Sequence, residues 1–81
     1  DMTEALDVDG LVRRALTEVA PELAPELDDL DPNVDLWREL ELDSMDHLSV
    51  MTRLSEATGR DIPERDYPKL RSLRSISEYL A

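Results

Sequence analysis

The sequence contains no cysteine and no phenylalanine among its 81 residues. Without cysteine the chain can form no disulfide, no thiolate metal site and no cysteine nucleophile. Its aromatic residues are one tryptophan and two tyrosines, so the core must consist of leucine, valine, isoleucine, methionine and alanine. A core of this kind gives a small domain only a narrow margin of stability. The composition therefore argues against a large buried active site.

Long apolar runs are also missing. No stretch approaches the roughly 20 apolar residues that a membrane-spanning helix needs, and no signal-peptide pattern is present. We therefore expect a cytoplasmic protein with no membrane span. The length suits a single domain over residues 1–81 and is too short for two domains.

Basic residues are few, because 9 lysines and arginines stand against 20 acids, a formal net charge of −11. This balance argues against nucleic acid and anionic membranes as partners, since both attract basic surfaces. The acids are concentrated: residues 21–46 hold ten acids and one base, Arg38, whereas residues 47–81 hold five acids and six bases. A local acidic surface favours basic protein partners.

The first part of the chain has the pattern of an amphipathic helix over about 7–20. Its apolar residues recur at helical spacing, and they are Val8, Leu11, Val12, Ala15, Leu16 and Val19. Asp7 or Thr3 could cap the start of this helix. Pro21 ends it, because a proline disfavours the helical conformation of the residue before it.

The segment 21–43 is predicted to be a long loop that contains three prolines. Loops of this length in a small domain are usually functional or anchored to the core. Apolar residues of the segment, Trp37 and Leu40 among them, could supply that anchor. A short helical turn is expected at about 35–40.

A second long helix is predicted over about 44–58, with Asp43 as its N-cap and Gly59 just past its end. The side chains expected to form its buried stripe are Leu48, Met51 and Leu54. The side chains expected on the opposite face are Met45, Asp46, Ser49, Arg53 and Glu56.

The remainder of the chain should contain a short helical turn at about 64–67, before Pro68, and a last helix at about 72–80 with Ser72 as N-cap. No strand pattern is evident. The predicted fold class is all-α: a small helical bundle of three main helices plus a short fourth, with a long first loop.

Asp43 and Ser44 are the residues best placed for chemistry. Ser44 stands in the first turn of the second helix, where unpaired backbone N–H groups and a partial positive charge favour a bound phosphate. Its hydroxyl would also be accessible to an enzyme that delivers a phosphoryl group. On position alone, the simpler interpretation is that Ser44 belongs to the helix cap.

The surrounding residues favour the chemical interpretation. Leu42-Asp43-Ser44-Met45 resembles the Asp-Ser-Leu attachment motif of the acyl carrier protein family, with methionine in place of leucine. Trp37 and Leu40 stand at the family's anchor positions, Ile62-Pro63 follows at the usual spacing, and residues 73–80 resemble the last helix. The resemblance covers nearly the whole chain.

The resemblance implies that a phosphopantetheinyl transferase, with Mg²⁺, attaches 4′-phosphopantetheine from coenzyme A to Ser44. Asp43 would then be part of what the transferase recognises as well as the N-cap. The chain would hold acyl intermediates as thioesters, catalyse nothing itself, and serve enzymes of fatty-acid, polyketide or related biosynthesis. Acyl-loading and acyl-processing enzymes with basic docking patches are the expected partners of a monomer. The residues expected to contact them are Glu39, Glu41, Met45, Asp46 and Glu56.

Three residues depart from the family pattern. Glu41 stands two residues before Asp43, where the family usually has glycine, so we expect the loop to turn differently. Ser49 replaces an acid that fatty-acid carriers usually have, and Arg53 adds a positive charge to the same face. These departures suggest a specialised carrier with partners of its own.

Other interpretations remain open at this stage. An acidic helical module that docks basic partners without a prosthetic group explains the charge equally well, and a peptidyl or aryl carrier of nonribosomal peptide synthesis is the nearest rival within the carrier class. The single histidine, His47, is expected to be partly packed and is not a candidate catalyst. An EF-hand starting at Asp31 is rejected, because Leu42 takes the position of its bidentate glutamate, and no metal site is expected.

Overall fold

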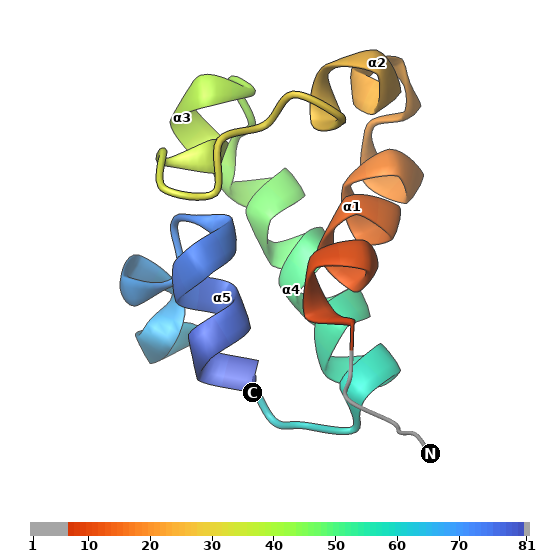
Figure 1. The fold of residues 1–81 in the computed structure, drawn as a ribbon. Coiled ribbons are helices and arrows are strands. Elements are labelled where there is room, and N and C mark those ends of the chain that lie inside the picture. The colour runs from red at the N-terminus through yellow and green to blue at the C-terminus, as the bar shows by residue number, and fades with distance from the viewer. Residues whose placement is uncertain (1–6, 81) are drawn as a thin grey trace.

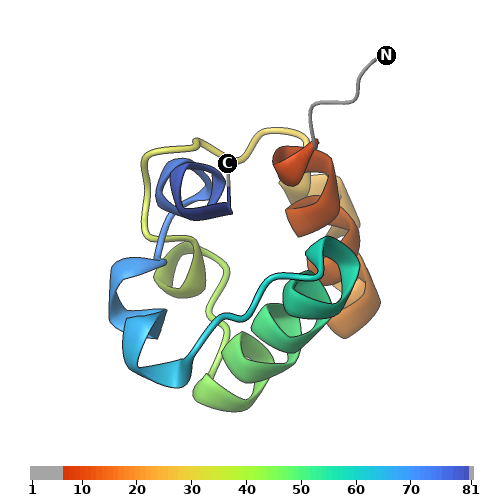
Figure 2. The same ribbon diagram turned by 90° about the horizontal axis from the view of Figure 1, so that it is seen from below.

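The computed structural model describes residues 7–80, which contain helices and no strand. The elements are α1 (Val8–Val19), the 3₁₀ helix η1 (Pro21–Leu23), α2 (Ala24–Leu27), α3 (Leu36–Glu39), α4 (Ser44–Thr58), the 3₁₀ helix η2 (Glu64–Lys69) and α5 (Leu73–Leu80). Helices α4 and α5 both pack beside α1, and the short α2 and α3 lie at the same end of the molecule but on opposite sides of it (Figure 1). The view from below shows the helices arranged around a common core (Figure 2). The all-α prediction is confirmed.

Helix α1 begins and ends close to where the sequence places it. The Asp7 side chain accepts a hydrogen bond of 3.0 Å from the backbone N–H of Gly10, which is one of the donors that a helix start leaves unpaired. The other predicted cap, Thr3, lies outside the described residues. Helix α1 buries an apolar stripe made of Val8, Val12, Ala15 and Leu16.

The segment 21–43 is more helical than predicted. A 3₁₀ turn and α2 occupy residues 21–27, where a loop was expected. The prediction was wrong because Pro21 and Pro25 each lie in the first two positions of a helix. Proline favours those positions, since its fixed φ suits a helix and its missing N–H would be unpaired there anyway. The expected turn at 35–40 is confirmed as α3.

Helix α4 covers the predicted range, but a different face of it is buried. Val50, Met51 and Leu54 are completely buried, whereas Leu48, predicted to be buried, is 42% exposed. At about 100° per residue, Leu48 lies roughly 110° from the middle of the observed stripe. The buried stripe is turned toward α1, against which α4 packs. On that side of α4, Ala57 lines two surface hollows together with residues of α1, and Arg53 lines one of them.

Near the C-terminus, η2 extends through Pro68 to Lys69, beyond the predicted turn at 64–67. A 3₁₀ helix accepts this proline because the fixed φ of its ring lies within the 3₁₀ range. Helix α5 starts as predicted, since the hydroxyl of Ser72 accepts a hydrogen bond of 3.0 Å from the backbone N–H of Ser75. No helix of the described residues is long and apolar enough to cross a membrane. The cytoplasmic location stays a prediction.

The stretch that leads to α4 is fastened to the segment before α5. The backbone N–H of Leu36 donates to the carbonyl of Arg71 at 2.7 Å, and the Trp37 indole N–H donates to the carbonyl of Leu70 at 2.8 Å. The Arg71 guanidinium also lies 2.7 Å from the carboxylate of Asp35. This ion pair, through a direct hydrogen bond, holds the pKa of Asp35 below its usual value. Trp37 is therefore an anchor to the core, as the sequence suggested.

Candidate functional site

The connection between α3 and α4 is a tight helix end. The N–H of Leu42 donates to the carbonyl of Trp37 at 2.8 Å, and the N–H of Glu41 donates to the carbonyl of Arg38 at 3.1 Å. This pair of bonds is the Schellman pattern, which satisfies carbonyl groups that a helix end leaves unpaired. Leu42 also packs against the core.

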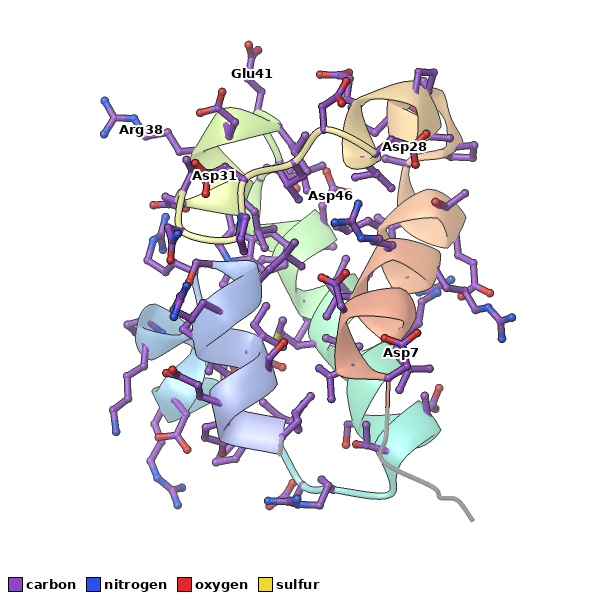
Figure 3. The ribbon with its side chains drawn as sticks, in the orientation of Figure 1. Asp7, Asp28, Asp31, Arg38, Glu41 and Asp46 are labelled. Carbon is purple, nitrogen blue, oxygen red and sulfur yellow. The ribbon has the colours of Figure 1, made fainter. Side chains whose placement is uncertain are left out.

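Glu41 occupies the left-handed position of this pattern, with φ of +55°. The expectation that glutamate would make the loop turn differently was therefore wrong. The backbone keeps the conformation that suits glycine, because the hydrogen bonds of the helix end and the packing of Leu42 hold it there. The Glu41 side chain points away from the body of the protein (Figure 3).

Asp43 and Ser44 directly follow this helix end in the sequence. The Asp43 side chain accepts a hydrogen bond of 2.9 Å from the N–H of Asp46, which confirms it as the N-cap of α4. Ser44 is the first residue of the helix, is exposed, and its hydroxyl makes no hydrogen bond within residues 7–80. The cap is thus supplied by Asp43, and the hydroxyl of Ser44 is left accessible at the positive end of a 15-residue helix.

The residues expected to contact partners lie in two places. Glu39, Glu41 and Met45 are exposed and Asp46 is half-buried. All four lie within five residues of Ser44 in the sequence. Figure 3 shows Glu41 and Asp46 at the end of the molecule that holds α2 and α3. Glu56 is exposed but lies twelve residues further along α4, about 18 Å from Ser44 along the helix axis. The structure therefore groups the first four around Ser44 and separates Glu56 from them.

Beneath Ser44, the ring of His47 is stacked between two aromatic rings. Its centroid lies 3.9 Å from that of Trp37 and 5.1 Å from that of Tyr67. Burial, with a smaller contribution from the charge of Arg71, lowers the pKa of His47, although Asp35 acts in the opposite direction. Nε2 of His47 is buried and has no hydrogen-bond partner among residues 7–80. His47 is thus packed, as predicted, and it ties the first turn of α4 to α3 and η2.

Sequence reasoning missed Leu48 as a surface residue and Tyr67 as a support of the site. Leu48 follows Ser44 by four positions and so lies directly beside it on the helix surface. Its exposure could not be predicted from the apolar pattern alone, because two overlapping apolar arcs exist on α4. Tyr67 carries no local signal, since its contact with His47 joins segments twenty residues apart.

Comparisons with known proteins agree with this geometry. Residues 11–80 match the sequence profile of the family described as "Phosphopantetheine attachment site". The chain is also similar to the acyl carrier protein of Syntrophobacter fumaroxidans (strain DSM 10017 / MPOB), with 26% identity over 76 residues that cover 94% of each chain. No solved structure gives a significant match. The chain therefore belongs to the acyl carrier protein family, whose members carry phosphopantetheine covalently and are carriers and not enzymes.

Proposed function

We propose that Ser44 is the residue that bears phosphopantetheine, and that the chain carries acyl intermediates of fatty-acid, polyketide or related biosynthesis. The observation that supports this assignment is exposure. The sequence has six serines, all within the described residues, and Ser44 alone among them is exposed. Two of the other serines make structural hydrogen bonds: the Ser55 hydroxyl donates to the carbonyl of Arg60 at 2.6 Å, and the Ser72 hydroxyl caps α5.

The position of Ser44 also suits a phosphodiester. The N-terminus of α4 presents backbone N–H groups and a partial positive charge, both of which favour a phosphate. In the attachment reaction the Ser44 oxygen forms a bond to the phosphorus next to the pantetheine of coenzyme A. The bond between that phosphorus and the bridging pyrophosphate oxygen breaks, adenosine 3′,5′-bisphosphate leaves, and the hydroxyl proton is lost. When bound, the arm supplies a thiol that carries an acyl group as a thioester.

The acids around Ser44 are proposed to guide basic docking patches of partner enzymes. Glu39 and Glu41 are exposed, Asp46 is half-buried, and a set of like charges around one site raises the rate of encounter with an opposite charge. Single exposed pairs are worth only about 0–1 kcal/mol, so the group acts together. Glu56 is proposed as a separate contact, for a partner large enough to cover the length of α4.

The attachment is tested by incubating the protein with coenzyme A, Mg²⁺ and a promiscuous phosphopantetheinyl transferase, followed by intact-mass measurement. The wild type should gain the mass of one phosphopantetheine, and Ser44→Ala should gain none. Ser49→Ala, at the next serine of the same helix, is the matched control and should be modified like the wild type. Wild-type protein that stays unmodified with several transferases would contradict the proposal, and would favour an interaction module without a prosthetic group.

The class of cargo is tested on protein isolated from its native host. An acyl or polyketide chain on the arm would support the proposed pathway class. An aminoacyl, peptidyl or aryl cargo would instead identify a carrier of nonribosomal peptide synthesis. The concentration of acids in residues 21–46 and the plain Asp43-Ser44 context favour the acyl alternative.

A further inference from the structure

Three aromatic rings fill the space on the core side of the first turn of α4. They come from three elements, Trp37 from α3, His47 from α4 and Tyr67 from η2, and each neighbouring pair is stacked with 23° between the ring planes. The centroid of His47 lies 3.9 Å from that of Trp37 and 5.1 Å from that of Tyr67. Carbon atoms in contact are about 3.5–4.0 Å apart, so a methylene chain that passed between two rings would need them about 7–8 Å apart. The stack has no room for such a chain.

The stack is fixed beside Ser44. Trp37 is 3% exposed, and its indole N–H donates to the carbonyl of Leu70 at 2.8 Å. His47 follows Ser44 by three positions, so the two side chains are neighbours on the surface of α4. A group that folded back from Ser44 toward the core, between α3, α4 and η2, would therefore meet the rings first.

The core behind the rings is also filled. Val50, Met51 and Leu54 of α4 and Ile76 of α5 are each at most 1% exposed. Hollows occur at the surface: two of about 470 and 330 Å³ lie between α1 and α4, and one of about 180 Å³ is lined by residues of α2, α3 and the segment between them. None of these three is lined by a ring of the stack. A packed interior resists an added chain, because extra methylene groups force its side chains out of their preferred conformations.

We propose that the stack of Trp37, His47 and Tyr67 closes the core to the cargo, so that this chain carries short or polar acyl groups that stay outside the bundle. The inference rests on the proposed attachment at Ser44. An apolar tail gains free energy by leaving water, and the gain grows with its length. A closed core offers a long saturated tail no such gain, whereas a short or polar acyl group loses little by remaining in water. Cargo held in this way reaches partner enzymes without first being drawn out of the core.

The test loads Ser44 with acyl groups of two lengths. A promiscuous phosphopantetheinyl transferase transfers butyryl- or decanoyl-phosphopantetheine from the corresponding acyl-coenzyme A, and circular dichroism gives the melting temperature of each product. Wild-type protein that carries decanoyl should melt within about 1 °C of wild-type protein that carries butyryl. A tail packed in the core would instead raise the melting temperature by several degrees, because each buried methylene group stabilises the folded state.

Substitution of His47 gives an open variant and a closed one. His47→Ala removes the middle ring and leaves between Trp37 and Tyr67 a space as wide as both stacking distances together, which is enough for a methylene chain. Its decanoyl form should melt at least about 3 °C above its butyryl form. His47→Phe keeps a ring in the stack and is the matched control, for which the two forms should differ no more than in the wild type. Comparing two acyl forms of the same variant cancels the effect of the substitution on stability itself.

Methyl NMR signals of Val50, Leu54 and Ile76 report on the core directly. In the wild type they should coincide for the two acyl forms, whereas in His47→Ala they should shift with decanoyl. Wild-type protein that accepts no arm from any of several transferases would refute the attachment at Ser44. Loaded wild type whose melting temperature rises, or whose core signals shift, with the longer acyl group would refute the closed core alone. A His47→Ala protein that shows neither change would overturn the role given to the ring stack.

Discussion

Replacing Glu41 with glycine should stabilise this protein, although a glycine substitution usually destabilises one. Glu41 has φ of +55° at the end of α3, a conformation that costs a residue with a Cβ atom about 1–2 kcal/mol. Glycine adopts it without that cost. Against this gain, glycine makes the unfolded chain more flexible, which removes about 0.4–1 kcal/mol of stability. The net gain in the free energy of unfolding should be about 0.5–1 kcal/mol.

The effect of the Glu41 charge on stability must be separated from the effect of its backbone conformation. Glu41→Gln keeps the side-chain length and the strained backbone but removes the charge, so it is the reference for the glycine variant. Urea unfolding at pH 7 gives the free energy of unfolding of each protein. For a domain of this size, 1 kcal/mol corresponds to roughly 4–8 °C in the melting temperature, so a gain of this size is measurable.

Glu39→Gly provides the opposite control. Glu39 is the last residue of α3 and has no positive φ, so glycine there should cost about 0.5–1 kcal/mol. The two glycine variants should therefore move in opposite directions. A Glu41→Gly protein that is no more stable than Glu41→Gln would refute the account of strain at this helix end.

Three further predictions concern the support of Ser44. Asp43→Ala should lower the free energy of unfolding, measured in urea, by about 1 kcal/mol, whereas Asp43→Asn should keep the cap and the stability. If Asp43→Asn still slows attachment, the transferase also recognises Asp43. Trp37→Phe leaves the carbonyl of Leu70 without its 2.8 Å donor and should cost about 1–3 kcal/mol in the same assay. His47 has a pKa below its unfolded value of 6.5, so the unfolded state binds more protons and stability falls as pH decreases through 6.5. Unfolding measured from pH 7.5 to 5.5 should show this fall in the wild type relative to His47→Phe, which keeps an aromatic ring and cannot titrate; parallel curves would contradict it.

Much of the fold could be predicted from residues that act locally. The bounds of α4 follow from Asp43 at its start and Gly59 past its end, and both caps have the expected geometry. The start of α5 follows from Ser72 in the same way. Local hydrogen bonds decide such ends, and the sequence records them directly.

The remainder could not be predicted from local propensity alone. Pro21 begins a helix where a loop was expected, because proline can precede or open a helical turn and the sequence does not say which. The buried face of α4 was misjudged since packing against α1 turned the helix toward Val50 and left Leu48 exposed. Glu41 shows the limit of propensity, since a helix end held by two hydrogen bonds keeps a conformation that glutamate disfavours.

In the candidate site, the cap and the exposed position of Ser44 could be predicted from the sequence, whereas the residues that support it could not. Asp43 as cap and an accessible Ser44 follow from the order of the residues, whereas the stack of His47 with Trp37 and Tyr67 joins three elements and has no local pattern. In this stack, the rings of Trp37 from α3 and Tyr67 from η2 hold the first turn of α4 in place through His47.

The residues that support Ser44 and the exposed apolar residues beside it therefore lie on different sides of the same turn. His47 and Asp43 hold the backbone of Ser44 in position, one from the core and one from the helix end, while Met45 and Leu48 face solvent. Substitution of a supporting residue should therefore lower the free energy of unfolding. A flexible arm needs a fixed anchor if its reach is to be set by its own length. If Ser44 bears the arm as proposed, the helix end at Glu41, the cap at Asp43 and the rings around His47 together provide that anchor, and they leave the hydroxyl exposed.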